Sequence, residues 1–138
     1  MTTKDFAELF SGLRLAYGSY RPNEDNGPGK QKGQYRVVSE DIDDDRLIEL
    51  WDNHLRGIES LGIVPIREDN SCVWGAIDID TYPLKHDALV ERLVKRNELP
   101  FVVARSKSGG AHVFCFVSEP VSASTMQTKL KEIASALG

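Results

Sequence analysis

The sequence lacks any long apolar run, and this absence excludes an integral membrane protein built on helices. A membrane-spanning helix needs about 20 consecutive apolar residues, and no segment of the 138 residues approaches that length. The first residues also lack the apolar centre of a secretory signal peptide. We therefore expect a cytoplasmic protein with no membrane partner.

Cysteine is scarce, and the spacing of the two cysteines that occur excludes the usual zinc modules. Cys72 and Cys115 do not form a Cys-x-x-Cys pair. The three histidines, His54, His86 and His112, show no recognisable ligand spacing with them. Each thiol is expected to be free and buried, which is the common state of a cysteine in a cytoplasmic protein.

An excess of positive charge is also missing. The formal net charge of −4 argues against a protein whose whole surface binds nucleic acid without specificity. A local basic channel remains compatible with the sequence, because basic residues gather in two segments. These are Arg14, Arg21, Lys30, Lys32 and Arg36, and then Arg92, Lys95, Arg96, Arg105 and Lys107.

The residues that are present describe an ordinary globular domain. Apolar residues make up 41% of the chain and charged residues 28%, and the length predicts a single domain over residues 1–138. Helical spacing with capping residues predicts helices, and short apolar runs between turn residues predict strands. The expected helices cover 3–15, 43–56, 85–97 and 122–137, and the expected strands cover 62–66, 73–80, 101–105 and 111–117.

The order of these elements predicts the fold class. The glycine- and proline-rich stretch from Tyr17 to Lys32 predicts a long loop rather than a regular element. The strands 62–66 and 73–80 are expected to form a hairpin across a polar turn. The fold is expected to be α+β, with a largely antiparallel sheet flanked by helices and some parallel pairing across the 85–97 helix.

The strand 73–80 ends in two carboxylates. Because side chains alternate along a strand, Asp78 and Asp80 are expected on one face together with Trp74 and Ala76. Two acids so close on an apolar strand raise one pKa or attract a cation. Carboxylate oxygens suit a hard divalent ion such as Mg²⁺ or Mn²⁺. A plain strand end with two solvated acids is the alternative interpretation.

A second chemical stretch runs from Arg105 to His112. Between these two residues it holds two hydroxyls, a lysine and a glycine pair, namely Ser106, Lys107, Ser108, Gly109 and Gly110. Paired glycines let the backbone approach a ligand and present its N–H groups. The stretch predicts a cradle for an anion such as a triphosphate, and a glycine hairpin with a structural histidine is the alternative. Together, the two stretches predict a metal–nucleotide site of the kind that a polymerase needs.

The two stretches carry a resemblance. Gly75-Ala76-Ile77-Asp78-Ile79-Asp80 and Ser106-Lys107-Ser108-Gly109-Gly110-Ala111-His112 resemble the first two motifs of the archaeo-eukaryotic primase superfamily. Within it, the sequence is most similar to the primase domain of TOTE conflict systems and to related phage primase-polymerases. The similarity extends to Tyr17-Gly18-Ser19-Tyr20, Gly29-Lys30, His54-Leu55-x-Gly57, Leu61-Gly62-Ile63-Val64-Pro65-Ile66 and Cys72-Val73-Trp74-Gly75.

The resemblance implies a fold, an activity and a set of site residues. The fold would be the N-terminal part of the primase catalytic core, an α/β module leading into an RRM-like module. Asp78 and Asp80 would hold Mg²⁺ or Mn²⁺ in a two-ion site, and His112 would contact the phosphates of an incoming nucleotide. The residues expected to help His112 are Arg105, Ser106, Lys107, Ser108, Gly109 and Gly110.

The implied activity is template-directed synthesis or extension of a primer. The substrates would be nucleoside or deoxynucleoside triphosphates on a single-stranded DNA template, and a helicase or other domains of the parent protein would be partners. Gly110 stands where many members have serine. The third metal-binding acid of the family would follow the last helix, so we expect a chain truncated at its C-terminus with an incomplete two-ion site, which could be inactive by itself.

Two other functions remain open at this stage. One is a non-catalytic module that binds a nucleotide or a nucleic acid with the same fold. The other is a metal-dependent nuclease or nicking enzyme, for which Tyr82, two residues after Asp80, would be the nucleophile.

Overall fold

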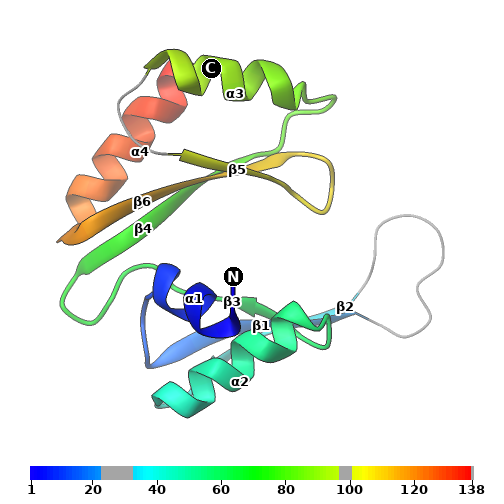
Figure 1. The fold of residues 1–138 in the computed structure, drawn as a ribbon, viewed down its shortest axis with the longest axis vertical. Coiled ribbons are helices and arrows are strands. Elements are labelled where there is room, and N and C mark those ends of the chain that lie inside the picture. Colours follow the sequence, from blue (N-terminus) through cyan, green and yellow to red (C-terminus); the bar gives the residue numbers. More distant parts are fainter. Residues whose placement is uncertain (23–32, 97–100, 138) are drawn as a thin grey trace. The chain divides into compact units, whose positions relative to one another are not determined.

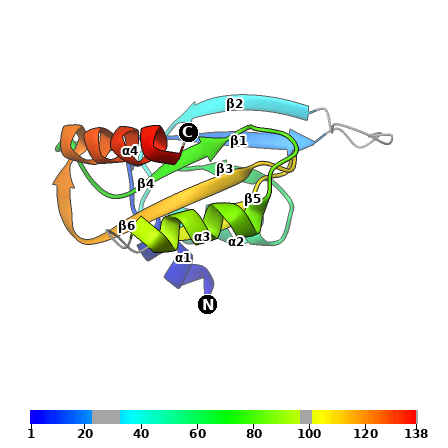
Figure 2. The same cartoon turned by 90° about the horizontal axis from the view of Figure 1, so that it is seen from above.

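The computed structural model describes residues 1–22, 33–96 and 101–137, and the chain divides into two compact units, Met1–Ser71 and Cys72–Gly138. Each unit contains a three-stranded sheet and helices (Figures 1 and 2). The architecture is therefore α+β, with two small sheets flanked by helices, which confirms the predicted fold class. In the described parts of the chain, no helix has the length and apolar character needed to cross a bilayer.

The first unit is built on a sheet with the strand order β2-β1-β3. Its elements are α1 (Thr3–Leu9), β1 (Ala16–Pro22), β2 (Gly33–Ser39), α2 (Asp44–Leu55) and β3 (Ser60–Gly62). β1 pairs antiparallel with both neighbours, so β2 lies at one edge of the sheet.

The core of the first unit lies between its sheet and its two helices. Trp51 of α2 is buried and stacks on Phe6 and Phe10, with ring centroids 5.7 and 5.5 Å away. Asp43 caps α2, because its carboxylate accepts a hydrogen bond from the Arg46 backbone N–H at 2.7 Å. This confirms the helix predicted over 43–56.

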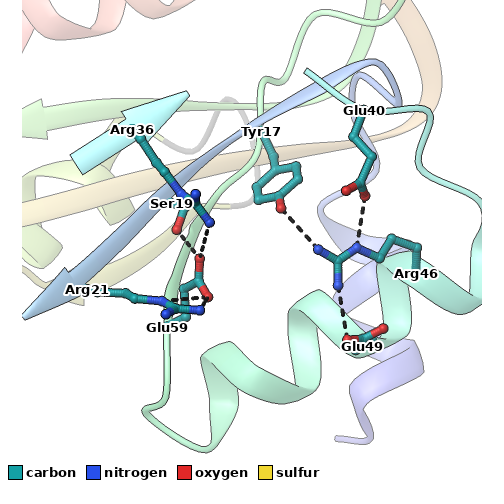
Figure 3. A network of polar contacts seen from close by, with 8 residues as sticks. All are labelled: Tyr17, Ser19, Arg21, Arg36, Glu40, Arg46, Glu49 and Glu59. Carbon is teal, nitrogen blue, oxygen red and sulfur yellow. Dashed lines mark hydrogen bonds and ion pairs between the residues drawn. The ribbon is translucent and has the colours of Figure 1, made fainter. Parts of the chain in front are cut away.

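Arg46 ties α2 to the sheet. Its Nε donates to Glu40 Oε2 at 2.8 Å, and its Nη2 donates to the hydroxyl of the buried Tyr17 of β1 at 3.2 Å (Figure 3). A guanidinium offers five donors in a fixed plane, so one side chain can hold two elements together.

Two expectations for the first 32 residues are corrected. The helix expected over 3–15 ends at Leu9. A Cβ on Gly12 would lie 2.2 Å from the carbonyl oxygen of Val64, so the chain there packs against a neighbouring backbone instead of continuing the helix. The loop expected from Tyr17 is in part a strand, since β1 reaches Pro22. Residues 23–32 lie outside the described residues, and with them the rest of that expected loop.

The hairpin expected between 62–66 and 73–80 is wrong. β3 ends at Gly62 and pairs with β1, where Gly62 lies opposite Gly18. The carbonyl of Val64 accepts a hydrogen bond from the Leu13 N–H at 2.9 Å. Residues beyond Gly62 therefore bond to the segment after α1 rather than to the strand that carries the two acids.

The second unit contains β4 (Ser71–Ile79), α3 (His86–Arg96), β5 (Phe101–Arg105), β6 (Ala111–Ser122) and α4 (Ala123–Leu137). The strand order is β4-β6-β5, and β5 pairs antiparallel with β6. Because β6 lies between β4 and β5, the parallel pairing expected across the 85–97 helix is wrong. The helices and strands of this unit otherwise follow the predictions, except that β6 continues beyond its expected end.

Helices α3 and α4 cover one face of the β4-β6-β5 sheet (Figure 1). Leu89 of α3, Ile133 of α4 and Val113 of β6 are among the fully buried side chains of this core. A Cβ on Gly75 would lie 2.7 Å from Leu130 Cδ1, so glycine lets α4 approach β4 closely.

Both cysteines of the second unit are free and buried, as predicted. Cys72 and Cys115 form a small apolar cluster with Met126. Burial raises the pKa of the Cys115 thiol, which keeps this group neutral and unreactive at neutral pH.

Candidate metal and nucleotide site

Strand β4 presents Asp78 on the face that turns away from the helices, and Asp80 follows the strand. Ile77 and Ile79 pack against the core beneath α3 and α4, and the alternation of a strand places Asp78 on the opposite face. The side chain of Asp78 is 61% exposed. Asp80 follows the last residue of the strand and is exposed.

His112 stands beside Asp78 at the start of β6. Its Nε2 lies 3.4 Å from Asp78 Oδ1. Its ring meets the edge of Phe114 at a centroid distance of 5.9 Å, and Phe114 stacks on Phe116 at 6.2 Å. His112, Phe114 and Phe116 therefore form a row along one face of β6, and the histidine ends this row next to Asp78.

The turn between β5 and β6 is closed by its own backbone. The Ser106 N–H donates to the Gly110 carbonyl at 3.0 Å, and the Gly109 N–H donates to the Ser106 carbonyl at 3.1 Å. Gly109 has a φ of +96°, a left-handed conformation that favours glycine. A Cβ on Gly110 would lie 2.1 Å from the carbonyl oxygen of Ile79, so the end of β4 requires glycine there.

Tyr82 joins the acidic pair to this turn. Its hydroxyl donates to Asp80 Oδ1 at 3.1 Å and lies 2.8 Å from Ser108 Oγ. A phenol has one hydrogen, so the serine hydroxyl is the donor in the second contact. The sequence pointed to Tyr82 only as a nucleophile; its spacing from Asp80 was the signal for a contact, but Ser108 is distant along the chain.

His86 holds the turn from the other side. Its Nε2 lies 2.9 Å from the Gly110 carbonyl oxygen, which can only accept, so Nε2 carries the hydrogen. The ring is half-buried at the first residue of α3. The residue that His86 contacts is 24 positions away in sequence, so no local pattern indicated this contact.

The structure does not bring all the expected phosphate-contacting residues together. Arg105 lies opposite Ala111, and strand alternation places it on the other face of β5 from Ala104, the partner of His112. The hydroxyl of Ser106 is buried and has no hydrogen-bond partner in the part of the chain that the structure describes. Lys107 and Ser108 are exposed on the turn, and Ser108 is linked to Asp80 through Tyr82.

The donor set suits a hard ion that is shared with a substrate. Within residues 1–22, 33–96 and 101–137, no group of three or more histidine, cysteine or acidic side chains could hold a metal ion. Mg²⁺ is commonly bound by one or two carboxylates, several waters and the phosphates of a substrate. Two exposed carboxylates next to a glycine turn fit that kind of ion, and they do not fit a structural zinc site.

Comparison with known families found a match over most of the chain. The family model described as "TOTE conflict system, Archaeo-Eukaryotic Primase domain" matches residues 6–137. The matched region includes both strands that carry the acids and the histidine. No curated protein matches the chain.

Proposed function

The chain belongs to the archaeo-eukaryotic primase domain family of TOTE conflict systems, and from this premise we propose a metal-dependent nucleotidyltransferase that makes or extends primers. At the level of the family, the activity is that of a primase-like nucleotidyltransferase. The proposal for this chain adds the substrates, which are nucleoside or deoxynucleoside triphosphates and a single-stranded DNA template. It also adds the setting, which is the cytoplasm and the replication of a phage or another mobile element.

The proposal rests on the contacts that Asp78 and Asp80 make with the β5–β6 turn and the start of β6. Asp78 contacts His112 at 3.4 Å, and Tyr82 links Asp80 to Ser108 through contacts of 3.1 and 2.8 Å. The carboxylate pair and the glycine turn therefore form one polar surface. A plain strand end with solvated acids would not require this second set of contacts.

Each group then has a role in binding. Asp78 and Asp80 would hold Mg²⁺ or Mn²⁺. When two such ions are bound, they would neutralise phosphate charge and activate the attacking hydroxyl. His112 donates from its ring to a phosphate oxygen, and Lys107 and Ser108 add a charge and a hydroxyl from the turn. His86 positions the turn by holding the Gly110 carbonyl.

The first test is binding of a nucleoside triphosphate with Mn²⁺, measured by isothermal titration calorimetry. We expect Asp78→Asn and Asp80→Asn each to abolish measurable binding, because each removes an anionic ligand without changing side-chain size. Glu91→Gln is the matched control, since Glu91 is 71% exposed on α3 of the same unit. Unchanged binding in both aspartate variants would contradict the proposal.

The same titration addresses the choice of sugar. A ribonucleoside triphosphate and the matching deoxyribonucleoside triphosphate are compared under identical conditions, and the ratio of the two affinities gives the preference. Primer extension on a single-stranded template is then measured with the preferred nucleotide, with Asp78→Asn as the inactive reference.

A metal-dependent nicking activity is a second candidate, favoured by the position of Tyr82. Its hydroxyl lies 3.1 Å from Asp80 Oδ1. In such a step the phenol oxygen would bond to a phosphorus atom, its proton would pass to Asp80, and a sugar oxygen would leave and take up a proton from water. Cleavage of a labelled DNA single strand with Mn²⁺ that is lost in Tyr82→Phe would support this activity. Absence of cleavage by the parent chain would exclude it.

A further inference from the structure

Tyr82 exposes an aromatic ring at the edge of the candidate site. Its side chain is 52% exposed, whereas Leu84, two positions later, packs against the core of the second unit. In the described part of this unit, the other phenyl and indole rings are buried or half-buried. Packing in the core therefore does not account for a large aromatic side chain at this position.

The hydroxyl of Tyr82 fixes the ring and is fully used within the protein. It donates its one hydrogen to Asp80 Oδ1 at 3.1 Å and accepts from Ser108 Oγ at 2.8 Å. A ring that is already held in one position loses little conformational freedom when a ligand packs on it. The part of Tyr82 that remains for a ligand is therefore its flat carbon surface rather than its hydroxyl.

The β5–β6 turn leaves the space beside this ring unfilled. A Cβ on Gly109 would lie 3.9 Å from Tyr82 Cε1, in ordinary van der Waals contact. Gly109 has a φ of +96°, a conformation in which glycine is favoured over residues with a side chain. No side chain of residue 109 therefore covers the ring, and a ligand on the turn can reach it.

Two different rings flank the pair of acids. His112 Nε2 lies 3.4 Å from Asp78 Oδ1, and the Tyr82 hydroxyl lies 3.1 Å from Asp80 Oδ1. An imidazole can donate a hydrogen bond to a phosphate oxygen, whereas the carbon face of a phenol cannot. Ligand sites commonly combine a few polar groups with an aromatic surface. A nucleoside triphosphate has the matching parts, which are a charged phosphate chain and a flat base.

We propose that the base of the nucleoside triphosphate stacks on the ring of Tyr82. Base–aromatic stacking tolerates any base, because every base has a π face. Tyr82 then favours nucleotides over inorganic polyphosphates without selecting one base strictly. The inference rests on the proposed function for the metal and the phosphates. It uses the ring and not the hydroxyl, so Tyr82→Phe separates it from the nicking activity.

Calorimetry with Mn²⁺ tests the stacking through two ligands, ATP and inorganic tripolyphosphate. The measured quantity is the ratio of their affinities, because any change at the metal or the turn affects both ligands and cancels. We expect Tyr82→Phe to keep this ratio within about twofold of the parent, since the ring remains. Tyr82→Leu keeps an apolar side chain but removes the ring, and the ratio is expected to fall about fivefold or more. Equal ratios in Tyr82→Leu and Tyr82→Phe overturn the proposal.

Tyr35→Leu is the matched control, because Tyr35 is 70% exposed and lies on β2 of the first unit. The same substitution there should leave the ratio unchanged. Far-UV circular dichroism checks that both leucine variants are folded, which we expect because both rings are exposed. An equal fall of the ratio in Tyr35→Leu would overturn the assignment to Tyr82.

A second comparison, of ATP with CTP, needs only the relative affinities of two nucleotides. Adenine has two fused rings and cytosine has one, so the parent should bind ATP about twofold or more tightly than CTP, and Tyr82→Leu should reduce this difference. The same ATP-to-CTP ratio in the parent and in Tyr82→Leu would overturn the base contact and would assign the ring to the sugar.

The outcome is separable from that of the proposed function. A parent chain that binds tripolyphosphate with Mn²⁺, and that loses it in Asp78→Asn, supports the metal and phosphate site whatever the ratios are. Unchanged ratios in Tyr82→Leu then overturn the inference alone. A folded parent chain that binds neither ligand overturns the proposed function, and the stacking with it.

Discussion

At the residue scale, the phenol of Tyr82 touches both halves of the candidate site. Tyr82→Phe removes the hydroxyl contacts with Asp80 and Ser108. The ring can keep its place near Gly109, where an added Cβ would lie 3.9 Å from Tyr82 Cε1. We expect about a tenfold loss of triphosphate–Mn²⁺ affinity by calorimetry, a loss typical of groups that orient metal ligands. Tyr35→Phe, which also removes one exposed hydroxyl, should have no effect. An unchanged affinity in Tyr82→Phe would show that triphosphate binding does not depend on the contact between the Tyr82 hydroxyl and Asp80.

His54 makes the stability of the first unit sensitive to pH. Its Nδ1 accepts a hydrogen bond from the Leu61 N–H at 3.1 Å, so this nitrogen is unprotonated. Burial lowers the pKa of the His54 imidazole below the ordinary value of 6.5. In the unfolded chain the imidazole takes up a proton near that ordinary value, whereas in the folded chain it does so only at a lower pH. The stability contributed by neutral His54 is therefore fully present above about pH 6.5 and is lost as the pH falls below it.

Urea denaturation at about pH 7.5 and about pH 5.5 measures this effect. His54→Asn keeps an acceptor for Leu61 but does not titrate, so its loss of stability between the two pH values should be smaller than that of the parent. His86→Gln is the control, since it removes a different histidine and should retain the His54 contribution. Equal losses in the parent and His54→Asn would contradict the assignment.

At the scale of the elements, the end of β4 and the β5–β6 turn are in close contact through Gly110. Gly110→Ser places a Cβ 2.1 Å from the Ile79 carbonyl, a backbone atom that cannot rotate away. We expect a loss of about 2 kcal/mol or more of unfolding free energy, as for overpacking of a tight site. Gly62→Ala is the matched control, because its Cβ would make an ordinary contact of 3.5 Å. Urea denaturation compares the two, and equal stabilities would show that β4 can shift.

At the scale of the whole molecule, the triphosphate is expected to protect the second unit and not the first. Hydrogen–deuterium exchange of the complete chain with triphosphate and Mn²⁺ should slow in β4 and in the segment from β5 to the start of β6, because the ligand binds only the folded site. Exchange in β1 and β2 of the first unit is the internal control and should stay unchanged. Equal slowing in β1 and β2 would contradict the assignment of the site to the second unit.

Local sequence patterns were sufficient for several elements and for the family, whereas the roles of the candidate site residues stay a prediction. The capping residue Asp43, the helical spacing in α2, α3 and α4, and the alternation that places Asp78 opposite Ile77 were all readable from the sequence. These features depend on residues a few positions apart, where periodicity and capping act directly. The family was recognisable for the same reason, since its motifs are short and continuous.

Contacts between distant residues were decided only by the tertiary structure. β3 pairs with β1 rather than with β4, the glycine-rich stretch after Tyr17 begins as a strand, and β6 separates β4 from β5. The links from Tyr82 to Ser108 and from His86 to Gly110 span 26 and 24 positions. No local pattern specifies such partners, because they depend on which surfaces meet after the chain has folded. The sequence by itself thus determined the family and the chemical groups, and the tertiary structure decided which of those groups lie together.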